Sequence, residues 1–335
     1  MSGVSGLRLI MMGTGPFAVP TFEALRGGPH EIVAVVTRPD RAPAGRRPPP
    51  NPMRAAAGAA GLPVLDPERV NEPAAVAAIA ALRPDLLVVC DYGQILSAGL
   101  LAVAPLGGIN LHGSLLPRHR GAAPVQWTIL EGDAVAGVSV FHMTPALDAG
   151  RVLAMRSTPV APRETAAELE PRLARLGVEA VVEAIEILAT VILATGARAG
   201  TLASVGTPQD AAGVTRAPRL AKADGVVDWT QPAAAIERRR RALEPWPRLA
   251  TFFTRGDGQR SRLVIEACGE DHTAAPDATD LAPGTVIEAA GDRLVVACGG
   301  GTALEIKRLV PEGRRSMSAA EFLRGSPLYA GSRLG

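Results

Sequence analysis

Cysteines and long apolar runs are scarce in this 335-residue chain, which excludes a disulfide-stabilised fold and a membrane-spanning helix. The three cysteines lie far apart without a CxxC pair, which excludes a disulfide framework and indicates a reducing compartment. No stretch approaches the roughly 18 consecutive apolar residues of a membrane span, and the first residues are typical of a strand rather than a signal peptide. We therefore expect a cytoplasmic protein without membrane association.

Lysine is also rare, so arginine supplies almost every positive charge. The formal net charge of +2 does not by itself indicate a nucleic-acid partner. The arginines are unevenly spread, however: five lie between residues 38 and 54, where Asp40 is the only acid and six prolines intervene. Such a segment is typical either of a stiff, solvated loop or of a loop whose guanidinium groups meet the phosphates of a polyanion.

Short apolar runs alternate with helical patterns through the first half of the chain. The predicted strands are bounded by Gly, Pro or Asp and cover residues 7–12, 32–37, 86–90, 108–112 and 138–143. Helix-like segments lie between them, around 17–25, 52–60, 73–82 and 124–130, and a long helix is predicted over 164–194. This alternation predicts an α/β, Rossmann-like domain with a mainly parallel sheet covered by helices.

The pattern changes after residues 196–213, a segment rich in Gly, Ala, Thr and Pro that we interpret as an interdomain linker. Short predicted strands separated by Gly or Asp turns follow, at 248–254, 263–268, 284–289, 294–297 and 304–309. Ser318 and Glu321 form a predicted capping box. The sequence thus predicts a first domain over 1–195, the linker, and a smaller antiparallel, OB-like β-barrel domain over 214–335.

The most informative pattern is Asn110-Leu111-His112-Gly113, followed at a distance by Leu147-Asp148-Ala149-Gly150. Residues 110 and 112 share one face of a predicted strand, at the end where open α/β sheets bind ligands. An amide, an imidazole and a carboxylate suit a reaction that forms an oxyanion and takes a proton from the nucleophile. Asn110, His112 and Asp148 are therefore candidate catalytic residues for acyl or formyl transfer, whereas His119 and His142 receive no role.

A second pattern, Gly13-Thr14-Gly15-Pro16-Phe17-Ala18, fits the G-x-G-x-x-A fingerprint of dinucleotide binding. The acid expected about 20 residues later is missing, because the second strand ends at Thr37-Arg38. Arg38 could instead meet a 2′-phosphate. An NADP-dependent oxidoreductase therefore stays open as a remote alternative.

Over nearly its whole length the chain resembles the methionyl-tRNA formyltransferase family. INLHGSLLPRHRGAAPVQW (109–127) is similar to the family's motif around the formyl-transfer site, LDAG (147–150) to its second catalytic motif, and DYGQIL (91–96) to its folate-side strand end. AKADGVVDW (221–229), RALEPWP (241–247) and MSAAEFL (317–323) resemble its C-terminal domain. The first motifs are shared by enzymes that use 10-formyltetrahydrofolate, and the later ones point to the tRNA substrate.

The resemblance implies formyl transfer from 10-formyltetrahydrofolate, as co-substrate, to the α-amino group of initiator methionyl-tRNA. It implies catalytic roles for Asn110, His112 and Asp148 and a tRNA-binding second domain; we expect a monomer and no metal. Folate contacts are implied for Ser114, Leu115, Leu116, Pro117, Asp91, Tyr92, Gly93, Ile95 and Leu96. Contacts with tRNA are implied for Arg38, Arg41, Arg46 and Arg47.

The chain departs from the family pattern in three places, none within the catalytic trio. The family usually reads G-T-P-[DE]-F where residues 13–17 read GTGPF. It usually carries a lysine pair after A-G-R-G, where this chain has Arg46-Arg47 and then prolines. Alanine is common where Asp91 stands.

The sequence is also compatible with other functions. A formyltransferase acting on an amino-sugar nucleotide would share the first domain and a similar second one. A formyltetrahydrofolate hydrolase would use the same trio with water as the nucleophile. The NADP-dependent enzyme would bind nicotinamide rather than folate, and a non-enzymatic RNA-binding protein built on the small barrel would leave the trio unexplained.

Overall fold

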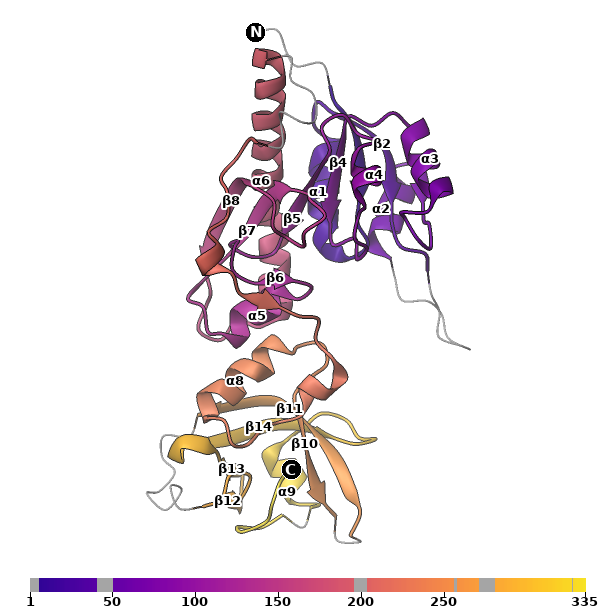
Figure 1. The fold of residues 1–335 in the computed structure, drawn as a ribbon. Helices are drawn as coiled ribbons and strands as arrows, with labels where there is room; N and C mark the ends of the chain where they lie inside the picture. Colours follow the sequence, from indigo (N-terminus) through magenta and orange to yellow (C-terminus); the bar gives the residue numbers. More distant parts are fainter. Residues whose placement is uncertain (1–5, 41–50, 196–203, 256–257, 271–280, 327) are drawn as a thin grey trace. The chain divides into compact units, whose positions relative to one another are not determined.

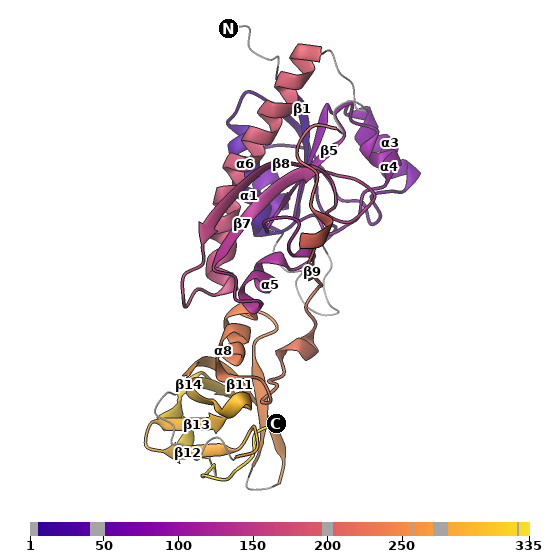
Figure 2. The same cartoon turned by 60° about the vertical axis from the view of Figure 1, so that its left-hand side comes forward.

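The computed structural model describes residues 6–40, 51–195, 204–255, 258–270, 281–326 and 328–335 (Figures 1 and 2). The chain forms two compact units. Unit 1 comprises Met1–Val125, Ala134–Val160 and Glu168–Pro218, and unit 2 comprises Gln126–Asp133, Ala161–Ala167 and Arg219–Gly335. Residues 204–213, which the sequence places in a linker, belong to unit 1.

A seven-stranded sheet in the order β3-β2-β1-β4-β5-β7-β8 forms the centre of unit 1. The first five pair in parallel, whereas β7 and β8 extend the sheet antiparallel. This confirms the predicted mainly parallel sheet. The strands are β1 (Arg8–Met12), β2 (Glu31–Val36), β3 (Val64–Leu65), β4 (Leu86–Cys90), β5 (Gly108–His112), β7 (Val135–His142) and β8 (Val152–Pro159).

Helices cover both faces of this sheet, with α1 and α6 on one face and α3 and α4 on the other (Figures 1 and 2). The helices of unit 1 are α1 (Val19–Arg26), α2 (Pro52–Ala59), α3 (Pro73–Ala81), α4 (Ala98–Leu101) and α6 (Ala166–Thr195), with a short 3-10 turn, η1, at Pro16–Ala18. Most of α5 (Pro124–Leu130) belongs to unit 2. None of the helices in the described ranges combines the length and apolarity needed to cross a membrane.

The strand β8 was not predicted from the sequence. Only its first three residues are buried, and the rest alternate between exposed and half-buried positions as expected at a sheet edge. A polar run such as Arg156-Ser157-Thr158 therefore lacks the apolar pattern of a strand, although it pairs along its length with β7.

Two short strands complete unit 1 next to the sheet. β6 (Arg120–Gly121) follows the β5 end, and β9 (Arg216–Ala217) pairs with it in parallel. Gly121 has φ +138°, and a Cβ there would lie 2.3 Å from the Ala217 carbonyl oxygen, so the two backbones approach closely only because residue 121 is glycine. A 3-10 turn, η2 (Ala211–Gly213), precedes β9 in the chain.

Unit 2 is built on a curled antiparallel sheet in the order β10-β11-β14-β13-β12, with β15 paired to β14. This agrees with the OB-like prediction. The strands are β10 (Ala250–Thr254), β11 (Arg260–Glu270), β12 (Val286–Ala290), β13 (Arg293–Ala297), β14 (Ala303–Pro311) and β15 (Met317–Ser318). Helices α8 (Ala233–Ala242) and α9 (Ala319–Leu323) accompany it, with 3-10 turns η3 (Lys222–Gly225) and η5 (Gly299–Gly301).

The predicted capping box at the start of α9 is confirmed. The Ser318 hydroxyl accepts from the Glu321 N–H at 3.2 Å, and the Glu321 carboxylate accepts from the Ser318 N–H at 2.8 Å. The helix then places Phe322 edge-on against Phe253 in the core of unit 2.

Helix α6 crosses β5 at a glycine. A Cβ at Gly177 would lie 2.6 Å from Cδ2 of the buried Leu111, which is the residue between Asn110 and His112. By contrast, a Cβ at Gly58 in α2 would meet nothing within 4 Å.

Replacing Gly177 with Ala should therefore destabilise the protein by about 1–2 kcal/mol, because overpacking costs more than the gain in helix propensity of about 1 kcal/mol. Gly58→Ala, the matched control, should stabilise it by roughly 0.5–1 kcal/mol. The free energy of unfolding of unit 1, measured in denaturant, distinguishes the two. Equal stabilisation by both changes would contradict close packing at residue 177.

Candidate active site

The structure brings two of the three predicted catalytic residues into direct proximity and places the third beside them on the strand. His112 ends β5, and Asp148 lies in the loop between β7 and β8. The His112 Nδ1 and Asp148 Oδ2 atoms are 3.9 Å apart, and both side chains are more than nine-tenths buried. Asn110 shares the His112 face of β5; it is partly exposed, and no described residue hydrogen-bonds its carboxamide.

The hydrogen bond on the far side of the His112 ring fixes its tautomer. Nε2 lies 2.9 Å from the carbonyl oxygen of His119. Because a carbonyl oxygen only accepts, the proton of the neutral ring must reside on Nε2. Nδ1 is therefore the atom with a free lone pair, and it is the atom that faces Asp148.

The loop that carries Asp148 is held from several directions. Asp148 Oδ2 accepts from the Gly121 N–H at 2.9 Å. Gln209 Nε2 donates to the carbonyls of Asp148 and Gly150 at 2.9 and 2.8 Å, while its oxygen accepts from Arg120. Asp148 itself adopts a left-handed backbone with φ +48°, a conformation that such contacts must hold in place.

His119 is a site residue that sequence reasoning missed. It is 2% exposed, not a surface residue, and its N–H donates to the Thr215 hydroxyl at 2.8 Å. Thr215, just before β9, thus holds the turn whose carbonyl accepts the hydrogen bond from His112 Nε2. Gly121 is visible in the GAAP stretch as a candidate tight turn, but nothing in the composition around Gln209 or Thr215 signals a place in a site.

Burial lowers the pKa of His112 from its ordinary value, and the Asp148 carboxylate opposes this by raising it, as does the hydrogen bond to His119. The imidazole is therefore neutral near pH 7. A neutral ring with a free Nδ1 beside a carboxylate can accept a proton and have the resulting charge stabilised at once.

The predicted folate segment 91–96 alternates between exposed and buried side chains. Tyr92 and Leu96 belong to the core of unit 1, whereas Asp91, Gly93 and Ile95 face outward, with Ile95 69% exposed. The segment follows β4, and the Gly13–Gly15 turn follows β1. Since helices after β1 and β4 cover opposite faces, these two strand ends flank the position where open sheets bind ligands.

The second predicted folate segment, 114–117, is mostly turned inward. Ser114 and Leu116 are 1% and 5% exposed, and the Ser114 hydroxyl donates to the Arg118 carbonyl at 2.7 Å. The Ser139 hydroxyl donates to the Ser114 carbonyl and accepts from the Leu116 N–H. Leu115 and Pro117 are half-buried. The segment shapes the turn after His112, and its folate contacts stay a prediction.

Asp91 lies directly against Gly15 of the first turn. A Cβ at Gly15 would lie 1.9 Å from Asp91 Oδ2. Partial removal from water raises the pKa of the Asp91 carboxyl to about 6; Glu170 adds to the rise, and the Gly15 N–H opposes it. Two of the departures from the family pattern, at residues 15 and 91, thus lie in contact with each other.

Of the four arginines predicted to contact tRNA, Arg41, Arg46 and Arg47 lie outside the described residues. Arg38 contacts the chain: its Nη1 donates to the Gly93 carbonyl at 3.4 Å, within the predicted folate segment.

The described chain offers no group of three or more His, Cys, Asp and Glu side chains arranged to hold a metal ion.

The family model described as "Formyl transferase" matches residues 7–185, and "Formyl transferase, C-terminal domain" matches residues 219–327. The chain belongs to the formyl transferase family. Its similarity to the methionyl-tRNA formyltransferase of Rhodopirellula baltica is 44% identity over 333 residues, covering 98% of this chain and 96% of that protein. That of Anaeromyxobacter dehalogenans strain 2CP-1 is also 44% identical, over 95% of this chain and 97% of its own length.

Formyl transferase architecture extends to solved structures of low identity. HypX from Aquifex aeolicus, in complex with tetrahydrofolic acid, is 16% identical, with a TM-score of 0.57 over 95% of this chain and 47% of that chain. This chain thus spans about half of HypX, and the likeness shows the fold alone. The matches favour neither an NADP-dependent oxidoreductase nor a non-enzymatic RNA-binding protein.

The tautomer and burial of His112 generate a titration test. NMR of the labelled imidazole should give a pKa below 6.5, and Asp148→Asn should lower it further, because the carboxylate offsets part of the cost of burial. The pKa of His30, which burial also lowers but Asp148 does not affect, is the control.

The same shift has a consequence for stability. Since the folded-state pKa lies below the unfolded one, the folded state binds fewer protons and loses stability as the pH falls below about 6.5. A His112 pKa at or above 6.5 would contradict the buried neutral ring. So would a His112 pKa that is the same in the wild type and in Asp148→Asn.

Proposed function

We propose that this chain transfers the formyl group of 10-formyltetrahydrofolate to the α-amino group of initiator methionyl-tRNA, giving formylmethionyl-tRNA for translation initiation. The observation that carries this function is the similarity to methionyl-tRNA formyltransferases over both domains, including the C-terminal one. The arrangement of Asn110, His112 and Asp148 supplies the chemistry. We further propose that the reaction proceeds in the cytoplasm, within one chain and without a metal ion.

The reaction begins with attack of the neutral α-amine on the formyl carbon. A C–N bond forms, and the π electrons of the formyl group move to its oxygen. The carboxamide of Asn110, to which no described residue hydrogen-bonds, is the donor to this oxyanion, which carries full charge only after attack.

The amine proton is then taken up on the His112 side. Nδ1 is the basic atom, since the His119 carbonyl holds the Nε2 proton. The Asp148 carboxylate, 3.9 Å away, stabilises the imidazolium and orients the ring. Collapse of the intermediate breaks the bond to N10 of the folate, and the imidazolium returns the proton to that nitrogen. Tetrahydrofolate leaves, and His112 is neutral again.

The folate lies at the carboxyl end of β4 in this proposal. The exposed Ile95 and Leu147 side chains offer apolar contact. Tyr92 and Leu96 support this segment from the core rather than contacting the ligand. Unit 2 and the arginine-rich segment 38–54 then bind the tRNA.

Incubation with 10-formyltetrahydrofolate and an amine acceptor tests the function. Charged initiator tRNA should be formylated, whereas amino-sugar nucleotides should not, and hydrolysis of the folate without an acceptor should be slow. Formyl transfer to an amino-sugar nucleotide alone, or fast hydrolysis in its absence, would assign the chain to another branch of the family.

Replacing His112 with Ala should lower kcat by about two orders of magnitude or more, since a positioned general base contributes roughly 10²- to 10⁴-fold to the rate. Folate affinity should change little, because the imidazole acts on charge that develops after binding. His142→Ala is the control, a buried histidine outside the trio. Single-turnover rates and folate binding separate the two effects; an H112A variant with more than a tenth of the wild-type rate would refute the assignment.

A further inference from the structure

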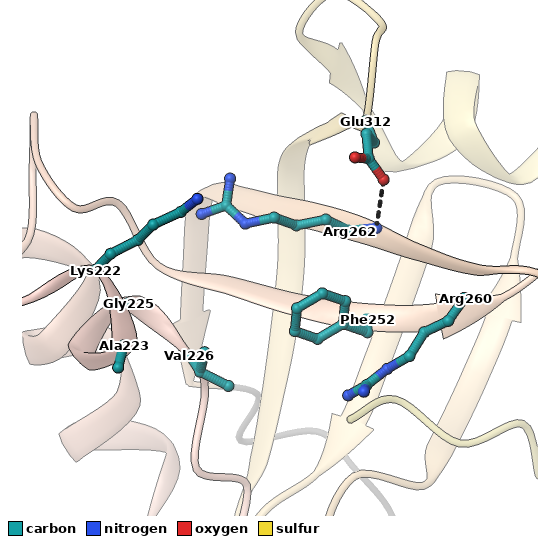
Figure 3. A pocket seen from close by; sticks show the side chains of 8 residues that line it. All are labelled: Lys222, Ala223, Gly225, Val226, Phe252, Arg260, Arg262 and Glu312. Carbon is teal, nitrogen blue, oxygen red and sulfur yellow. Dashed lines mark hydrogen bonds between the residues drawn. The ribbon is translucent and has the colours of Figure 1, made fainter.

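Unit 2 contains a groove that the formyl-transfer site does not use (Figure 3). Its volume is about 440 Å³, within the range of small-ligand sites. The 3-10 turn η3, the hairpin of β10 and β11 and the chain after β14 form its walls. The lining residues are Lys222, Ala223, Gly225, Val226, Phe252, Arg260, Arg262 and Glu312.

The groove carries three positively charged side chains. Among the described residues, no carboxylate forms an ion pair with Lys222, Arg260 or Arg262. Glu312 accepts a hydrogen bond from the backbone N–H of Arg262 at 3.4 Å rather than from its guanidinium. Figure 3 shows the ends of Lys222 and Arg262 pointing toward each other. Two like charges that converge in this way repel each other, and an anion between them would remove the repulsion.

An aromatic surface lies beside these charges. Phe252 pairs with Arg262 and Thr254 with Arg260, so Phe252, Arg260 and Arg262 share the outer face of the hairpin. The alternate residues Phe253 and Ser261 are buried on the other face. The Arg260 guanidinium lies 4.2 Å from the centre of the Phe252 ring, and Val226, at the groove wall, is 46% exposed.

Resting on the proposed function, we propose that this groove binds one unstacked nucleotide of the tRNA, its phosphate between Lys222 and Arg262 and its base against Phe252. An inorganic anion would use the two cations but not the ring, and an acidic peptide would use no aromatic platform. A nucleotide uses both, since phosphates attract Lys and Arg while bases stack on aromatic rings and guanidinium planes.

Two sets of groove variants separate the phosphate from the base. In K222Q/R262Q, tRNA binding should weaken, and the slope of log K against log salt should shrink by about 0.7–0.9 for the lost phosphate contact. In F252L, which keeps an apolar side chain, affinity should fall roughly 5- to 100-fold with little change in slope. K307Q/R293Q removes the same number of charges from β14 and β13 outside the groove and should bind as wild type does.

Binding is measured on the full chain with uncharged initiator tRNA at several salt concentrations, and formyl transfer is measured separately with charged tRNA. The groove variants should raise the KM for tRNA and leave kcat at saturation unchanged, because the reacting groups belong to unit 1. Groove variants with wild-type affinity and salt slope, in a chain that does formylate tRNA, would overturn this inference alone. A wild-type chain that neither binds nor formylates tRNA would instead overturn the proposed function.

Discussion

The hydrogen bond from His112 Nε2 to the carbonyl of His119 is the constraint on which the site depends. It decides where the ring keeps its proton and hence which nitrogen can receive another. Without it, the Asp148 carboxylate would draw the proton to Nδ1, and the ring would face the carboxylate as a donor with no basic atom there. A single backbone carbonyl thus determines that Nδ1, and not Nε2, is the nitrogen that can accept a proton.

That carbonyl stays in place through contacts from distant parts of the chain. Thr215 binds the His119 backbone, β9 pairs with β6, and Gln209 links the Asp148 loop to Arg120. Each of these partners lies more than 55 residues from the segment it holds. Residues 209–217 therefore hold the catalytic residues in position. Their contribution is preorganisation of the site, and they take no part in the chemical step.

Periodicity and local chemistry in the sequence predict much of the fold and part of the site. The parallel strands and the capping box at Ser318 follow from residue patterns within short windows, and the proximity of His112 to Asp148 follows from matching their chemistry. The polar edge strand β8, the buried His119 and the bracing Gln209 were missed. Each acquires its role from backbone pairing or from a partner far along the chain. A short segment of sequence does not contain this information.

The contact between Asp91 and Gly15 couples the two positions for any redesign of the site. With the Asp91 side chain as it lies, a Cβ at residue 15 would be 1.9 Å from Oδ2, so a side chain at 15 requires the carboxylate to move or residue 91 to be smaller. The effects of substitutions at 15 and at 91 on stability are therefore expected to be non-additive, because residues in contact share an interaction energy.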